Sequence, residues 1–183
     1  MRVVRHERRW GPGAMQGFTL IELLVTIAVL AILIAVAVPS FTSLINANRL
    51  ASQANEIVAT LQSARSEAVR LNTSVVVCRS TDGASCAAAG TWDRWIIRVT
   101  ATGEVLRDTA VKPPVQVTSG GAASFTFRSD GRARDAAGGL LANNFTVCVP
   151  TTLPAANQRV VSIASGSRVS VASANGAGAC PAL

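Results

Sequence analysis

The chain has 183 residues, of which 49% are hydrophobic and 15% are charged, and its formal net charge is +7. It contains one histidine, His6, and no tyrosine. Nucleophilic enzymes commonly need a histidine base, and the one histidine here lies in the basic N-terminal segment, ahead of the long apolar run. No glycine-rich phosphate loop followed by lysine is present. The sequence therefore argues against an enzyme and against a cofactor. The length suits one small domain beyond an N-terminal segment.

The first 17 residues are basic. They contain one acidic residue, Glu7, and four arginines, Arg2, Arg5, Arg8 and Arg9. Basic flanks of a membrane segment stay in the cytoplasm, so we expect a cytoplasmic N terminus and export of the rest. A secretory signal peptide fits poorly, because the apolar run is long and the small residue Gly17 precedes it. A plain single-pass anchor remains an alternative, but it does not explain Glu22.

An apolar run extends from Phe18 to Val38 and contains one carboxylate, Glu22. A charge in hydrocarbon costs at least ~2.5–3.5 kcal/mol, so such a residue is expected to be functional and to have a partner. Pro39 follows the run. Proline lacks a backbone N–H, and we therefore expect a kink or local opening of the helix at this residue.

The segment 46–72 has apolar residues spaced by three and four positions, which are Leu50, Ala54, Ile57, Leu61, Ala64, Ala68 and Leu71. This spacing places them on one face of a helix. The residues off this face are Arg49, Gln53, Glu56, Thr60, Ser63, Glu67 and Arg70. We expect the apolar stripe to pack on the protein's own sheet, in a helix that runs from Phe18 to about Leu71.

Residues 74–183 alternate between β-branched or apolar runs and turn signals. The pattern predicts strands at 75–78, 95–99, 104–106, 115–117, 124–127, 145–149, 160–163 and 169–171. The segment Ala101-Thr102-Gly103 predicts a hairpin, and Pro113-Pro114 a break between strands. The expected fold is α+β: a long N-terminal helix, with a membrane half and an amphipathic half, packed on an antiparallel β-sheet head.

Four cysteines are present, Cys78, Cys86, Cys148 and Cys180. An even number in an exported domain predicts two disulfides, for which three pairings are possible. We expect Cys78–Cys86, which closes a short loop with the turn signal Asp82-Gly83, and Cys148–Cys180, which holds the Gly/Ala-rich tail. A zinc site is disfavoured, because no Cys-x-x-Cys pair exists and the histidine lies in the basic leader.

Arginines supply nearly all the positive charge of the head, which has one lysine, Lys112. The candidate phosphate-binding residues are Arg128, Arg132, Arg134 and Arg168. Asp130 and Asp135 partly offset the first three. The arginines are either ordinary solvated surface or a patch that binds DNA phosphates with strong salt dependence.

The segment Gly17-Phe18-Thr19-Leu20-Ile21-Glu22, followed by an apolar helix, resembles the processing site of type IV prepilins and pseudopilins. The resemblance implies that prepilin peptidase cuts after Gly17 and that Phe18 becomes an N-methylated terminus. It also implies that Glu22 meets the terminal amine of a neighbouring subunit during assembly. Met15 is an alternative start, but the leader would then lack its basic residues, so we favour the longer leader, residues 1–17.

The head resembles the minor pilin family that joins FimT with type II secretion protein H. The resemblance rests on Ala68-Val69-Arg70, Cys78-Arg79-Ser80, Trp92-Asp93-Arg94-Trp95-Ile96, Phe127-Arg128-Ser129-Asp130-Gly131-Arg132 and Val160-Val161-Ser162-Ile163-Ala164-Ser165-Gly166. It implies a non-enzymatic subunit of a type IV pilus or a type II secretion pseudopilus, with other pilins as partners. The implied location is the inner membrane, with the membrane and assembly helix at 18–45 and a periplasmic head at 46–183, and then the filament.

Some FimT proteins share a C-terminal Gly-Arg-x-Arg that binds incoming double-stranded DNA during natural transformation. The matching place in this chain reads Ser167-Arg168-Val169-Ser170, which keeps one arginine. A literal Gly131-Arg132-Ala133-Arg134 occurs earlier, in what we expect to be a different turn. DNA binding is therefore the alternative function.

Overall fold

The computed structural model describes residues 17–164 and 167–182. Residues 1–16 of the predicted leader lie outside this part of the chain. The chain divides into two compact units, 1–38 and 39–183. One helix, α1 (Leu20–Arg70), begins in the first unit and ends in the second.

The part of α1 in the first unit is apolar and exposed. An 18-residue window of the helix has a mean hydropathy of 2.9, and none of it is buried. By length and composition this segment could cross a membrane. The helix continues without interruption through Pro39, and the kink at that residue stays a prediction.

The second half of α1 buries the stripe expected from its sequence. Leu50, Ala54, Ile57, Leu61, Ala64 and Ala68 are all buried. Leu71 was wrongly placed on the stripe: it follows the last residue of the helix and is 38% exposed. Thr60, expected off the stripe, is 2% exposed, and its buried hydroxyl is satisfied by a hydrogen bond that it accepts from the indole of Trp95.

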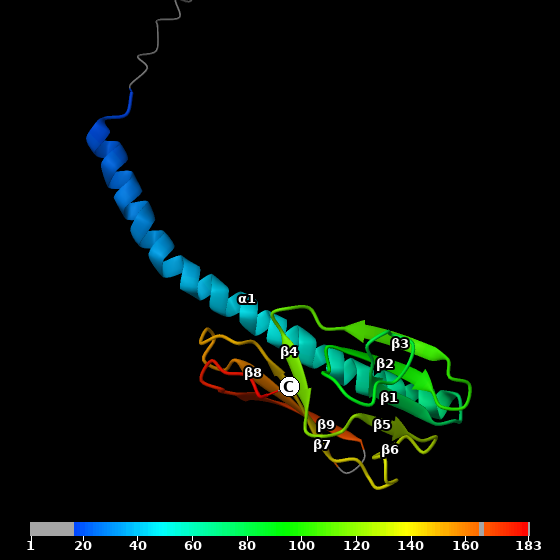
Figure 1. Ribbon diagram of the computed structural model, residues 1–183. Coiled ribbons are helices and arrows are strands. Elements are labelled where there is room, and N and C mark those ends of the chain that lie inside the picture. Colours follow the sequence, from blue (N-terminus) through cyan, green and yellow to red (C-terminus); the bar gives the residue numbers. More distant parts are fainter. Residues whose placement is uncertain (1–16, 165–166, 183) are drawn as a thin grey trace, which may run out of the picture. The chain divides into compact units, whose positions relative to one another are not determined.

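Two antiparallel sheets make up the rest of the head (Figure 1). The first has the order β3-β2-β1-β5-β6 and contains β1 (Val75–Arg79), β2 (Arg94–Val99), β3 (Val105–Ala110), β5 (Ser124–Phe127) and β6 (Ala133–Arg134). The second has the order β4-β7-β8-β9 and contains β4 (Gln116–Ser119), β7 (Asn143–Cys148), β8 (Gln158–Ala164) and β9 (Arg168–Ala174). The α+β architecture predicted from the sequence is confirmed.

One short strand, β6, was not predicted. The Gly-Arg-x-Arg segment begins in a tight turn after β5 and ends in β6, and in this turn the N–H of Gly131 donates to the carbonyl of Arg128 across 2.8 Å. Gly131 has φ of 71°, a conformation that glycine adopts without a steric penalty. The turn thus pairs Thr126 with Arg134 and ends the first sheet.

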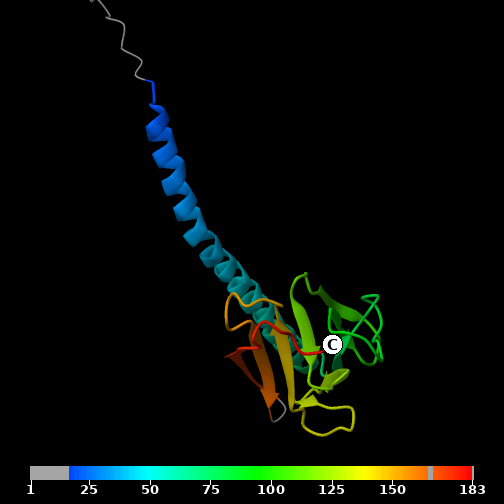
Figure 2. The same cartoon turned by 60° about the vertical axis from the view of Figure 1, so that its left-hand side comes forward.

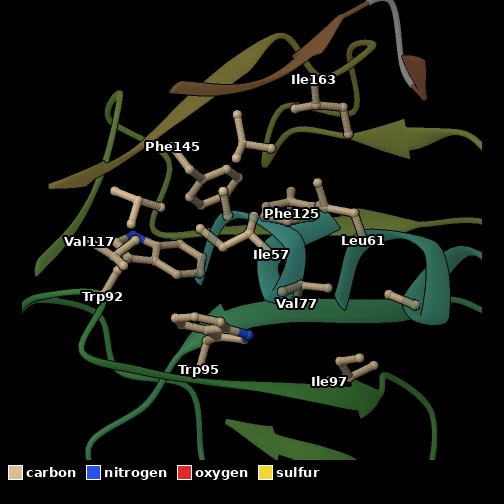
Figure 3. Close-up of a cluster of buried hydrophobic side chains, with 14 of the residues drawn as sticks. Ile57, Leu61, Val77, Trp92, Trp95, Ile97, Val117, Phe125, Phe145 and Ile163 are labelled. Atoms are coloured by element: carbon tan, nitrogen blue, oxygen red, sulfur yellow. The ribbon is translucent and has the colours of Figure 1, made fainter. Parts of the chain in front are cut away.

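Aromatic side chains fill the space where α1 and the two sheets meet (Figure 3). Trp92 packs edge-on against Phe145 of β7, with ring centroids 5.1 Å apart. Phe125 of β5 lies 5.9 Å from Phe145. Ile57 and Leu61 of α1 line the same cluster. Burial of such rings contributes strongly to stability, so this cluster holds the helix and both sheets together.

Two disulfides, Cys78–Cys86 and Cys148–Cys180, are present with the pairing expected from the sequence. The second holds the C-terminal tail beside β7. Asn157, which is fully buried, adds to this attachment. Its amide donates to the carbonyls of Val149 and Ala179, and its oxygen accepts from the N–H of Gly176.

Candidate functional site

The N-terminal motif lies at the start of α1. Thr19 is the residue before the helix, and its hydroxyl accepts a hydrogen bond from the N–H of Glu22 at 3.2 Å. A threonine cap followed three residues later by glutamate is a capping-box sequence. This role of Thr19 was not predicted from the sequence, although the Thr-x-x-Glu spacing indicates it. The cap fixes the first turn, which carries Glu22.

Glu22 is exposed among apolar neighbours in this first turn. Within residues 17–164 and 167–182, no salt bridge involves its carboxylate. Phe18, directly before the cap, is 86% exposed. A carboxylate near a helix N-terminus is favourable for the helix itself, worth about 0.3–1 kcal/mol. That contribution is small beside the cost of a charge in hydrocarbon, so helix capping alone does not account for Glu22.

The candidate DNA-binding arginines fall into two groups. Arg134 is half-buried and binds Asp130 at 3.4 Å, and it donates to the carbonyl of Gly138. Arg128, Arg132 and Arg168 are exposed, and no salt bridge in the described structure involves them. Arg134 is therefore held by contacts within its own turn, whereas the three exposed arginines are available to bind an external anion.

A hydrogen bond joins the two arginine-bearing segments. The hydroxyl of Ser167 donates to the carbonyl of Gly131 across 2.8 Å. The β5–β6 turn, which carries Arg132, therefore lies beside the start of β9, which carries Arg168. Arg65 of α1 also borders this turn, because a Cβ placed on Gly131 would lie 3.2 Å from its Nε. The sequence did not identify Arg65, since its closeness to Gly131 depends on the tertiary fold.

Two family models match the chain. The prokaryotic N-terminal methylation motif matches residues 14–38. The model of type II transport protein GspH matches residues 53–167, which is more than half of the chain. The chain belongs to the GspH family. It is thus a member of the minor pilin and pseudopilin group, and the family expected from its sequence is confirmed.

Solved structures of such proteins are similar to this GspH-family chain. One of them is a crystal structure of the type IV minor pilin FimU of Pseudomonas aeruginosa, which is 24% identical to this chain in sequence and matches its fold with a TM-score of 0.51. The match covers 68% of this chain and 89% of FimU. The minor pseudopilin EpsH of Vibrio cholerae is 13% identical, with a TM-score of 0.49, and the match covers 68% of this chain and 97% of EpsH. The likeness to FimU supports the fold. No curated protein sequence gives a significant match.

Proposed function

We propose that this protein is a non-enzymatic filament subunit, a minor pilin or pseudopilin, that assembles through α1. The observation that carries the proposal is the carboxylate of Glu22, the one acidic residue of the apolar run 18–38, exposed in the first turn of α1. The match of this segment to the N-terminal methylation motif supports it. Prepilin peptidase removes residues 1–17, and Phe18 becomes the methylated terminus.

Electrostatics gives Glu22 its role in assembly. Cleavage leaves a positive amine on Phe18, and an amine and a carboxylate attract strongly at low dielectric. Each charge alone is costly there, whereas a pair between adjacent subunits offsets part of the cost. The residues 18–45 form the membrane and assembly segment, and residues 46–183 form the periplasmic head. The filament is a type IV pilus or a type II secretion pseudopilus.

Incorporation into filaments tests this proposal. Cells that express the Glu22→Ala protein should process it normally but leave it in the membrane fraction when filaments are sheared off and pelleted. A matched control is Glu56→Ala on the same helix, which removes a partly exposed ion pair with Arg107 and should not alter incorporation. Normal incorporation of the Glu22→Ala protein would refute the assembly role.

DNA binding for natural transformation is a second candidate function. The favouring observation is the Ser167–Gly131 hydrogen bond, which brings the turn that carries Arg132 beside Arg168. Exposed arginines on adjacent segments can contact successive phosphates of a duplex. Arg132, in the turn between β5 and β6, and Arg168, at the start of β9, thereby contribute to one basic surface.

The test is DNA binding by the full chain in detergent, titrated with salt. Arg132→Ala and Arg168→Ala should each weaken binding and reduce its salt dependence, by a slope of about one per lost phosphate contact. Arg107→Ala is the control, because that arginine is already paired with Glu56. Equal losses in all three variants would indicate nonspecific attraction, and an absence of binding at low salt would exclude this function.

A further inference from the structure

The four sheet edges of the head are not equally protected. Exposed edge strands tend to pair with other chains, and proteins block them with charges, bulges or short strands. β6 has two residues and β4 has four. β3 carries Arg107 and Asp108 at its centre, and its pairing with β2 has a register shift at Ile97/Arg98. These three edges are therefore poor templates for a further strand.

The edge at β9 is long, pairs without a bulge and carries a charge at one end only. Its seven residues pair with β8 in continuous register, from Gln158↔Ala174 to Ala164↔Arg168. Arg168, at one end, is its only charged residue, and the strand contains neither proline nor lysine. No helix or loop in the described part of the chain donates a hydrogen bond to its backbone or accepts one from it. The strand forms the outer margin of the second sheet (Figure 2).

One face of β9 is also incompletely covered. Val169 and Val171 pair with Ile163 and Val161, both of which are buried, so the two valines lie on the core side of the sheet. Val171 nevertheless remains 47% exposed. A strand added outside β9 would place its alternate side chains next to these valines and cover the exposed apolar surface.

A groove of about 490 Å³ adjoins the N-terminal end of β9, where Ser167 and Val169 line it. Leu61, Val69, Phe127 and Val169 supply apolar lining, and Arg65 and Arg70 supply charge. Among the residues that the structure describes, no acidic side chain lines the groove. Glu67, close by on α1, is already bound to Arg70 at 2.6 Å. Arg65 is exposed, and no salt bridge of the described structure involves it. The groove therefore favours an apolar side chain accompanied by a carboxylate.

We propose that the β9 edge and this groove bind an extended segment of a partner protein, which adds as a further antiparallel or parallel strand. Main-chain hydrogen bonds to β9 supply affinity, and the groove selects a segment of small or β-branched residues that carries an acidic side chain near Arg65. This contact goes beyond assembly through α1, because it uses a surface of the head formed by β9, by Phe127 of β5 and by the last turns of the helix.

The experiment uses the full chain in detergent and a labelled nine-residue peptide of alternating valine and threonine with a central glutamate. Saturable binding is expected, with exchange of the β9 amide hydrogens slowed at least ~10-fold and exchange in β3 unchanged. The same peptide with alternate amides N-methylated should bind at least ~10-fold more weakly, because its main-chain donors are lost. A peptide with lysine in place of the glutamate should also bind more weakly. The Arg65→Ala protein should bind the glutamate peptide and the lysine peptide equally.

Protein variants give the matched comparison. Val171→Lys places a charge on the exposed edge and should abolish peptide binding, whereas Val105→Lys on the β3 edge should leave it unchanged. Thermal unfolding verifies that both variants fold. The proposal is overturned if no saturable binding occurs up to millimolar peptide, or if the N-methylated peptide binds equally well. It is also overturned if β9 pairs with a second copy, seen as a dimer that Val171→Lys dissociates, or if the groove takes duplex DNA and not the peptide.

Discussion

The indole N–H of Trp95 donates to the hydroxyl of Thr60 across 3.1 Å, and both residues are 2% exposed. This bond joins β2 to α1. Thr60 in turn donates to the carbonyl of Glu56 one turn earlier, so both partners of the buried bond are fixed. The contact sets the position of the first sheet along the second half of α1.

Removal of the Thr60 hydroxyl should destabilise the head. Thr60→Val keeps the shape but leaves the buried Trp95 N–H without an acceptor, a loss of about 1–3 kcal/mol in the free energy of unfolding. Thr60→Ser retains the hydroxyl and should cost less. Urea unfolding measures both. A Thr60→Val protein as stable as the unmodified chain would show that the bond contributes nothing.

Stability should fall in acid partly because of Asp82. Hydrogen bonds from the Ser85 hydroxyl and then from the N–H groups of Ser85 and Ala84 hold the pKa of the Asp82 carboxyl far below its usual range. A carboxyl whose pKa is lowered on folding stabilises the fold above its unfolded pKa of ~3.9, and this stabilisation is lost as the pH falls below that value.

The check is the pH dependence of unfolding between about pH 6 and pH 2. Asp82→Asn should flatten the loss of stability below about pH 4. Glu104→Gln is the control, since Glu104 is exposed and no hydrogen bond to its side chain is seen in the described structure. Identical acid profiles for Asp82→Asn and the unmodified protein would contradict the role of Asp82.

The two disulfides should contribute unequally. Cys148–Cys180 spans 32 residues and Cys78–Cys86 spans 8. The chain-entropy model gives about 4 kcal/mol for the longer loop and about 2.5 kcal/mol for the shorter one. Paired alanine substitutions provide the comparison, and they are well matched because Cys78 and Cys148 are both buried. Denaturant unfolding that shows a larger loss for the shorter loop would contradict this account.

Sequence patterns predicted the helix well because its signals are local. The three- and four-residue spacing of Leu50 to Ala68 marks the buried face directly. Thr60 was misplaced because its burial depends on a partner 35 residues away. The strand β6 was missed for the same kind of reason, since two residues become a strand only through pairing with β5. Local pattern thus determines the elements, and tertiary contacts determine the exceptions.

The candidate sites differ in the same way: one is contiguous in the sequence, and the others are formed by residues that the fold brings together. The motif Gly17 to Glu22 is contiguous and could be predicted entirely from the sequence. The closeness of Gly131 to Ser167 depends on the fold, and so do the position of Arg65 and the unprotected edge of β9. The sequence identified the candidate arginines, but their closeness to one another could be seen only in the fold.

Replacement of Gly17 should block processing. Gly17→Leu places a bulky side chain at the proposed cut, and a Cβ added at Gly17 would meet no described atom within 4 Å apart from its chain neighbours, so the change should not disturb the fold. The expected product retains the leader and stays in the membrane fraction. Phe18→Leu is the matched control, which alters the other side of the bond and should still be cleaved. A mature-sized Gly17→Leu product would count against peptidase cleavage at this bond.

The intact mass of the protein recovered from sheared filaments tests whether the chain is a processed filament subunit. We expect a chain that begins at Phe18, carries one added methyl group and gains four hydrogens on reduction of its two disulfides. Recovery of the chain with its leader attached, or its absence from filaments that contain the other subunits, would contradict the claim that this is a processed filament subunit.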